Sequence, residues 1–224
     1  MAANIPDIDS KVFSKNIDDY LDKRKPSLVI KRIFDIVMSL IGLIILGIPM
    51  IIIGIIIKLS SEGPVFYKQV RVGKSNKDFK ILKFRTMIVD ADKKGMQITV
   101  GKDPRITGIG HFLRKTKIDE LPQLINVLKG EMSFVGPRPE VRKYVEMYND
   151  YQKNVLKIKP GITDLASIEY RDESTLLGQS ANPEKTYIEE IMPTKLKLNL
   201  KYMQEFSFFY DIKLILKTLV KIVE

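Results

Sequence analysis

The sequence has no cysteine and a single histidine, His111. The absence of cysteine excludes disulfides and thiolate chemistry, and it leaves the redox compartment unmarked. With one imidazole, zinc sites built from histidine and cysteine are excluded, and a Ser-His-Asp triad would have to use His111. Any metal ion must therefore be held by aspartate and glutamate, which favours a hard cation such as Mg²⁺.

Acidic residues are in the minority. The 224 residues include 37 Lys and Arg against 27 Asp and Glu, a net charge of +10. Such a surplus points to an anionic partner, either nucleic acid, acidic lipid or a phosphorylated substrate. Hydrophobic residues make up 45% and charged residues 29% of the chain, which is typical of a globular protein. The length suits one compact domain with appendages.

Charge is missing altogether from residues 36–57. As a helix this run would be ~33 Å long, about the thickness of the hydrocarbon core of a bilayer. A cleaved signal peptide fits poorly, because the run starts late and no small-residue cleavage site follows it. A buried helix of a soluble protein is the alternative, and the length and purity of the run favour the membrane.

Both flanks of this run are basic, with Lys31 and Arg32 before it and Lys58 and Lys68 after it. By the positive-inside rule both ends prefer the cytoplasm, which a single straight span cannot satisfy. Pro49 lies near the middle of the run, where a proline removes a backbone hydrogen bond and kinks a helix. We expect a re-entrant helix that bends at Pro49, and a kinked spanning helix is the alternative.

The expected fold is α+β and mostly helical, in three parts: a polar, irregular lead-in over 1–27, the membrane helix over 28–59 and the main domain over 60–224. Alternating apolar residues around a Gly-Lys-Ser-Asn turn predict a β-hairpin. Pro122 and Gly130 bound a predicted helix, and other helices are expected nearby. The predicted segments are the hairpin 64–87, helices 109–115, 119–129 and 139–157, and a loop 101–110.

The C-terminal segment from Asp211 onwards has apolar residues at helical spacing and a lysine at every fourth position, Lys213, Lys217 and Lys221. This pattern predicts an amphipathic helix. It could lie in the lipid headgroup layer, or it could pack on the core of the domain itself.

Asp119 and Glu120 form the most interesting pair of side chains. Proline is favoured in the first turn of a helix, so Pro122 places both carboxylates at a helix start. There the helix dipole favours negative charge, and an ionised carboxylate can act as a covalent nucleophile or as a magnesium ligand. Acidic residues at helix starts are also ordinary caps, so the pair alone does not establish catalysis.

Two basic features accompany the pair. In Gly136-Pro137-Arg138-Pro139 the prolines restrict the backbone around Arg138, whose planar guanidinium suits phosphate, although a structural turn is the alternative. Lys83 and Arg85 alternate along the second predicted strand and are expected on one face. They belong to a basic stretch over 58–85 that is either a solvated surface or a contact with anionic lipid.

Several ordered blocks together resemble the bacterial sugar transferases, the monotopic phosphoglycosyl transferases that begin lipid-linked glycan assembly. The resemblance covers about residues 28–220. The blocks that carry it are Gly63-Pro64-Val65-Phe66, Lys83-Phe84-Arg85-Thr86-Met87, Asp119-Glu120-Leu121-Pro122-Gln123, Asn126-Val127-Leu128-Lys129-Gly130, Met132-Ser133 and Val135-Gly136-Pro137-Arg138-Pro139.

The resemblance implies an enzyme on the cytoplasmic face of the bacterial inner membrane, with a re-entrant helix bent at Pro49. It implies that Asp119 attacks a UDP-sugar with the help of Mg²⁺, that UMP leaves, and that polyprenyl (undecaprenyl) phosphate then takes the phospho-sugar. Glu120 would hold the metal with Asp119, and Lys83, Arg85 and Arg138 would bind the substrate. Such a reaction is the first membrane step in making a capsule or another exopolysaccharide.

The chain departs from the family pattern in two places. Asp164-Leu165-Ala166-Ser167 and Glu169-Tyr170-Arg171 replace motifs common in the family, and Asn199 stands where many members have aspartate. These departures leave open which UDP-sugar is used and which glycan is made. His111 is read as a surface or packing residue.

A non-catalytic adaptor that binds anionic lipid or an assembly partner is the alternative function, whereas nucleic acid is not an expected partner. A homodimer is left open.

Overall fold

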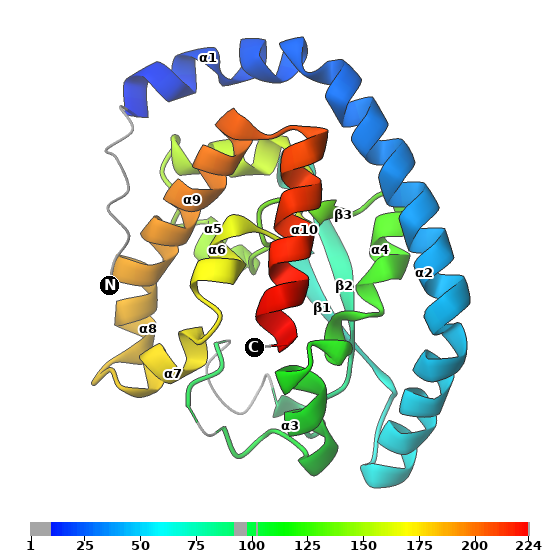
Figure 1. Cartoon of the computed structure of the whole chain (residues 1–224). Helices are drawn as coiled ribbons and strands as arrows, with labels where there is room; N and C mark the ends of the chain where they lie inside the picture. The colour runs from blue at the N-terminus through cyan, green and yellow to red at the C-terminus, as the bar shows by residue number, and fades with distance from the viewer. Residues whose placement is uncertain (1–9, 92–97, 102, 224) are drawn as a thin grey trace.

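The computed structural model describes residues 10–91, 98–101 and 103–223. The described chain is mostly helical, as predicted, with two small pairs of strands (Figure 1). The helices and strands, in chain order, are α1 (Ser10–Lys23), α2 (Lys25–Ser60), β1 (Phe66–Val72), β2 (Asp78–Phe84), α3 (Gly108–Lys115), α4 (Gln123–Lys129), β3 (Ser133–Val135), α5 (Arg142–Val145), β4 (Gly161–Thr163), α6 (Leu165–Glu169), α7 (Glu173–Gly178), α8 (Pro183–Thr186), α9 (Met192–Glu205) and α10 (Phe208–Val223). Single turns of tighter or wider helix are η1 (Lys74–Asn76), η3 (Ile118–Glu120), η4 (Gln152–Lys157) and η5 (Tyr187–Ile191).

The predicted hairpin is confirmed. Strands β1 and β2 pair antiparallel in a register that runs from Phe66 opposite Phe84 to Val72 opposite Asp78. One side of the hairpin packs on α4, and α4 in turn packs on α2. A short parallel pair, β3 with β4, lies beside α10, and α9 packs against α6 and η4 around the largest apolar core (Figure 1).

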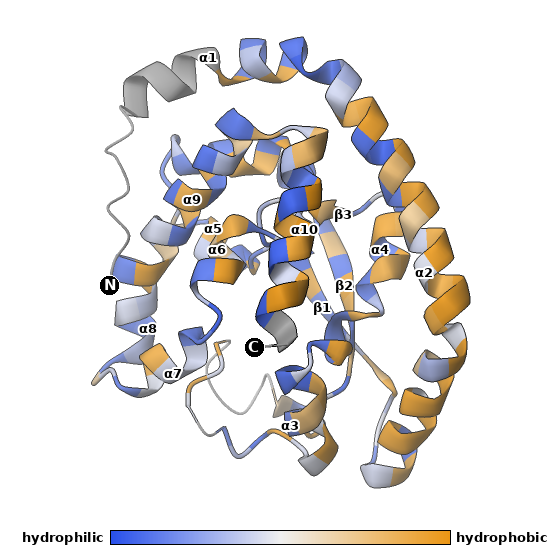
Figure 2. Ribbon diagram, in the orientation of Figure 1, coloured by the Kyte–Doolittle hydropathy of each residue, from blue (hydrophilic) through white to orange (hydrophobic). Residues whose placement is uncertain are grey.

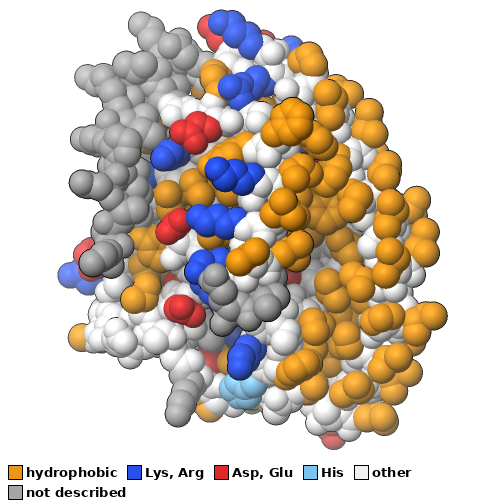
Figure 3. All heavy atoms as spheres, in the orientation of Figure 1, with side chains coloured by type: hydrophobic (Ala, Val, Ile, Leu, Met, Phe, Trp, Pro, Cys, Tyr) orange, Lys and Arg blue, Asp and Glu red, His pale blue; other side chains and the backbone are white. Residues whose placement is uncertain are grey.

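Helix α2 is a single helix of 36 residues that curves around one side of the domain, with Pro49 inside it (Figure 1). It is long and apolar enough to cross a membrane. Hydrophobic residues make up most of its ribbon in Figure 2, and their side chains form a broad apolar surface in Figure 3. Ile44 and Ile48 are each 72% exposed. An apolar face of this size marks a membrane or protein contact rather than ordinary surface.

Polar side chains near the start of α2 tie this helix to the domain. Arg32 donates to the carbonyls of Val127 and Leu128, at 2.7 and 2.9 Å, in the last turn of α4, where backbone acceptors lack helical partners. The buried carboxylate of Asp35 accepts from the Ser133 hydroxyl and the Phe134 amide of β3, each at 3.1 Å. Helix α2 is therefore attached to the last turn of α4 and to strand β3.

Arg85 performs the same task at the other end of α2. It follows β2 and is 5% exposed. Its guanidinium donates to the carbonyls of Ile57, Ser61 and Glu62 and to the Ser61 hydroxyl. The Ile57 carbonyl also accepts from the Ser61 amide. The Ser61 and Glu62 carbonyls follow the last turn of α2, so Arg85 supplies donors where the helix offers none.

Two expectations about secondary structure are wrong. The lead-in expected to be irregular contains α1, whose Ile17 side chain is buried in the main core. The helix expected over 139–157 is instead α5 and η4, separated by a turn. Asn149 and Gln152 form reciprocal side chain to backbone hydrogen bonds of 2.8 and 3.0 Å in that turn, and such bonds compete with a helix.

The predicted C-terminal helix is α10, and of the two alternatives considered for it the structure shows the packing on the domain. Leu214 is buried, and its face packs on α6, β3 and β4. Leu216 and Val220 are instead more than half exposed on another face. Thr218 forms a hydroxyl contact with Thr163 of β4. The helix is thus fixed to the domain while it presents apolar side chains outward.

The role of Arg85 can be tested with Arg85→Met. This change removes the Arg85 donors from the carbonyls at the end of α2. We therefore expect the free energy of unfolding to fall by about 2 kcal/mol and Tm to fall by roughly 4–8 °C in a thermal-shift assay. Arg142→Met is the matched control, because Arg142 pairs with Asp78 on the surface and exposed pairs contribute little. If Arg85→Met instead keeps a normal Tm but weakens the binding of the UDP-sugar that the resemblance implies, Arg85 is a substrate ligand.

Candidate active site

Asp119 and Glu120 lie in η3, the single turn just before α4. Lys117 precedes them in a left-handed conformation with φ 57°, and Pro122 occupies the position before the first residue of α4. Gly130, with φ 84°, ends α4, as its lack of a Cβ atom allows. The predicted helix over 119–129 thus begins only at Gln123, and the two carboxylates stand in the turn just before it. Both are buried, at 6% and 8% exposure.

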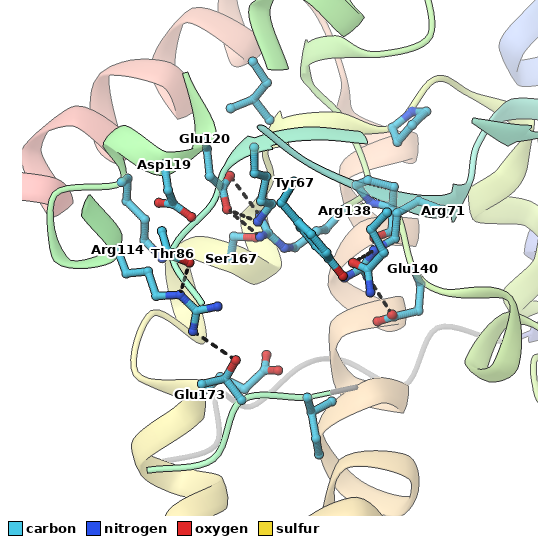
Figure 4. A pocket seen from close by; sticks show the side chains of 18 of the residues that line it. Tyr67, Arg71, Thr86, Arg114, Asp119, Glu120, Arg138, Glu140, Ser167 and Glu173 are labelled. Atoms are coloured by element: carbon cyan, nitrogen blue, oxygen red, sulfur yellow. Dashed lines mark hydrogen bonds and ion pairs between the residues drawn. The ribbon is translucent and has the colours of Figure 1, made fainter. Parts of the chain in front are cut away.

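Glu120 is held by two cations from different segments (Figure 4). Its Oε1 atom lies 2.8 Å from Lys83 Nζ of β2 and 2.7 Å from Arg138 Nη2 of the Gly-Pro-Arg-Pro loop. Burial raises the pKa of Glu120, but Arg138 and Lys83 outweigh it and hold that pKa well below its usual range. Glu120 in turn raises the pKa of Arg138. The Glu120 carboxylate is therefore ionised at neutral pH.

Asp119 is placed differently, although it is the adjacent residue. Its Oδ1 atom is buried and has no hydrogen-bond partner. Burial raises the pKa of Asp119, and the nearby Lys83 only partly opposes this. The sequence argument that the helix dipole favours the ionised form is therefore wrong in its net direction, because desolvation outweighs a dipole that fades within one turn. An unsatisfied carboxylate oxygen of this kind is suited to a metal ion or an electrophile.

A large cavity of about 1350 Å³ adjoins these residues. Lys83, Arg85, Asp119, Glu120 and Arg138 all line it. The structure brings Asp119, Glu120, Lys83 and Arg138 together, whereas the Arg85 guanidinium is turned to the end of α2.

Sequence reasoning missed several polar residues of the cavity. Arg114, in the last turn of α3, donates to the hydroxyls of Thr86 and Thr99 at 2.8 and 3.2 Å (Figure 4). Its charge acts on Asp119 and lowers the pKa of that carboxyl. Nothing in the sequence separates Arg114 from the neighbouring Lys115, which is exposed. Only the packing of α3 on the segment just after β2, where Thr86 lies, identifies it.

A second ion pair supports the loop that carries Arg138. Arg71 of β1 lies 2.9 Å from Glu140, and the Tyr187 hydroxyl donates to the other oxygen of that carboxylate. The Val141 amide also donates to Glu140, at 2.7 Å. These contacts fix the backbone two residues beyond Arg138 and so fix the direction from which Arg138 reaches Glu120.

The departures from the family pattern lie along the same cavity. Asp164 is fully buried and caps α6 by accepting from the Ser167 amide at 2.9 Å. Arg171 and Asn199 line the cavity, and the Oδ1 atom of Asn199 is buried without a hydrogen-bond partner. His111 is exposed on α3 at the cavity.

Within the described part of the chain, no group of three or more acidic or histidine side chains comes together as a metal site. Asp119 and Glu120 are the carboxylates next to the cavity cations Lys83 and Arg138. A Mg²⁺ ion is commonly held by one or two carboxylates, with the remaining ligands supplied by substrate phosphates and water. The unpartnered Asp119 oxygen fits that kind of site.

Comparison with known proteins places this chain in a family. The family model described as bacterial sugar transferase matches residues 26–224. A UDP-glucose:undecaprenyl-phosphate glucose-1-phosphate transferase of Escherichia coli (strain K12) is 38% identical over 197 residues, which cover 86% of this chain and 40% of the relative.

Two further relatives differ in length and in name. A UDP-N-acetylgalactosamine-undecaprenyl-phosphate N-acetylgalactosaminephosphotransferase of Aeromonas hydrophila is 37% identical over 85% of this chain and 43% of its own. The exopolysaccharide production protein PSS of Rhizobium leguminosarum bv. phaseoli is 40% identical over 86% of this chain and 94% of its own. The chain thus spans about two fifths of the length of the first two relatives and nearly all of the third.

The burial of Asp119 predicts an effect on stability. Because folding raises the pKa of Asp119, its ionised form opposes folding above that pKa, and the cost disappears when acid protonates the carboxyl. We expect Asp119→Asn to raise Tm by roughly 2–4 °C near pH 8 and to have little effect near pH 4. Asp150→Asn, at an exposed position, is the control. A lower Tm for Asp119→Asn near pH 8 would contradict this account.

Proposed function

Because the chain belongs to the bacterial sugar transferase family, we propose that it transfers a phospho-sugar from a UDP-sugar to polyprenyl phosphate. The observation that carries the proposal is the unpartnered carboxylate oxygen of Asp119 beside the Glu120, Lys83 and Arg138 cluster. The names of two relatives describe transferases of a sugar phosphate that pair a UDP-sugar with undecaprenyl phosphate. Their names differ in the sugar, so the donor is proposed only as a UDP-sugar.

In the proposed first step, Asp119 attacks the phosphorus that carries the sugar. A bond forms between its carboxylate oxygen and that phosphorus, and the bond to the bridging oxygen of UMP breaks, so UMP leaves with the electron pair. Lys83, Arg114 and Arg138 lie close enough to the two carboxylates to reduce the repulsion between an anionic nucleophile and an anionic diphosphate. Asp119 must be ionised to attack, which its burial opposes.

In the second step, an oxygen of polyprenyl phosphate attacks the same phosphorus. The bond from Asp119 breaks, and the free carboxylate is restored. Splitting the transfer in this way lets one site serve two substrates in turn, one soluble and one lipid. We propose that Asp119 and Glu120 hold Mg²⁺ together with oxygens of the donor, and that the bound ion neutralises diphosphate charge.

We also propose that α2 enters the bilayer, bends at Pro49 and returns, so that the domain lies on the cytoplasmic face. The exposed apolar side chains of α2 and the basic residues at both of its ends support this arrangement. The proposal places the nucleophile beside the membrane, where a lipid acceptor can reach it. The homodimer has no support in these observations.

Turnover tests the proposed activity. Protein in detergent with Mg²⁺, undecaprenyl phosphate and a panel of UDP-sugars should release UMP with one or more donors. Asp119→Asn should lower that rate by roughly 10³-fold or more, because it removes the nucleophile, while Asp150→Asn keeps it. Mass spectrometry of donor-treated protein should find the phospho-sugar on Asp119. If every UDP-sugar fails, and lipid binding weakens with salt regardless of Asp119, the protein is an adaptor instead.

The absence of native cysteine makes the topology directly testable. Lys25→Cys and Glu62→Cys place one thiol at each end of α2, and both positions are exposed. If α2 is re-entrant, a membrane-impermeant thiol reagent should label both variants from the cytoplasmic side only, in inverted vesicles but not in intact cells. Labelling of the two thiols from opposite sides would establish a spanning helix.

A further inference from the structure

Helix α10 forms one wall of the central cavity. Ile215, Thr218 and Leu219 of this helix line the cavity, and across it lie Leu121 and Leu124, which belong to the segment that begins with the two carboxylates. In Figure 3 the surface is hollowed between α10 and the apolar face of α2. Apart from Thr218 and Lys221, the α10 side chains and the two leucines that border this part of the cavity are aliphatic.

The space between α10 and α2 is closed at one end. Phe34 of α2 packs against Phe208 at the start of α10 and against Phe134 of β3, with ring centroids 5.4 and 6.0 Å apart. From this aromatic contact the two helices diverge, and α4 lies between them (Figure 1). Helix α2 packs closely on α4, since a Cβ atom on Gly42 would lie 3.1 Å from Leu124. The part of the cavity that lies between this wall of α10 and Leu121 and Leu124, at and before α4, is called the wedge below.

The wedge joins two chemically different regions. The cations Lys83 and Arg138, which are paired with Glu120 next to Asp119, line the same cavity. At the outer edges of the wedge are exposed apolar side chains of α2, such as Ile44 and Ile48, and of α10, such as Leu219. A path that runs from fixed positive charge to an apolar surface matches a molecule with an anionic head and a long hydrocarbon chain.

We infer that the wedge between α10 and α4 holds the hydrocarbon chain of the polyprenyl phosphate acceptor, with its phosphate directed toward Asp119. This inference rests on the proposed function. A UDP-sugar is polar along its whole length and fits the other side of the cavity, which is lined by Ser167, Glu173, Lys195 and Asn199. The two substrates would therefore approach Asp119 from different walls, with α10 as the lipid side.

Two leucines of α10 provide a matched test. Leu219 is 55% exposed and lines the cavity, whereas Leu216 is 57% exposed and lies outside its lining. Leu219→Trp should narrow the path and raise the KM for undecaprenyl phosphate about tenfold. A change of this size corresponds to the lipid chain losing the burial of about two methylene groups. Leu216→Trp should leave this KM within about twofold of wild type. Leu219→Asp, a second variant, should raise it as well, because it places a charge on the apolar path.

Two readouts separate lipid binding from general damage. The KM for the UDP-sugar should stay unchanged in all three variants. With an acceptor phosphate that carries a single isoprene unit, the KM values of the Leu219 variants should approach that of wild type, because most of the chain contact is absent. If wild-type protein transfers no phospho-sugar, the proposed function fails. If it does transfer phospho-sugar and Leu219→Trp and Leu216→Trp share one acceptor KM, the inference about the wedge alone is overturned.

Discussion

The contact on which the site depends is the Glu120 carboxylate between Lys83 and Arg138. It joins the hairpin, the turn before α4 and the Gly-Pro-Arg-Pro loop, three segments that are far apart in sequence. Removing one partner of a buried carboxylate strongly destabilises the folded protein, because an uncompensated charge remains. The hairpin and the loop are each attached at a second point through Arg71 and Glu140, so the two cations cannot easily move apart. The cluster therefore sets the positions of all three segments at once.

This arrangement divides two adjacent carboxylates into different chemical states. Glu120 receives both nearby cations, and its pKa is low, whereas Asp119 keeps an unpartnered oxygen and a raised pKa. If Asp119 were fully paired, it would be a stable anion with little reason to bond to phosphorus. The unfavourable burial of Asp119 is tolerated because the neighbouring contacts fix its backbone, and binding of a ligand can relieve it. The carboxylate that is paired with cations and the carboxylate that keeps an unpartnered oxygen are thus adjacent but separate residues.

Local signals predicted the elements of the site but not its partners. Pro122 and Gly130 bounded the helix after Asp119, the alternating residues around Gly73 gave the hairpin, and the uncharged run gave α2. Each depends on neighbours in the chain. The pairing of Glu120 with Lys83 and Arg138 depends on the packing of segments that no local pattern relates, and so does the attachment of Arg85 to α2. The failed helix over 139–157 belongs to the same class, because Glu140 there bridges to Val72 of the hairpin.

If Asp119 is the nucleophile, the attachment of α2 explains how a soluble donor and a lipid acceptor can both reach it. Arg85 binds the end of α2 and lies two residues after Lys83, while Arg32 binds the end of the helix that Asp119 and Glu120 precede. Both ends of the apolar helix are therefore hydrogen-bonded to segments that build the site. If α2 lies in the bilayer, its depth fixes the distance between Asp119 and the lipid headgroups. A membrane segment joined by a flexible linker would leave that distance unset, and a lipid phosphate would then have to leave the interface to react.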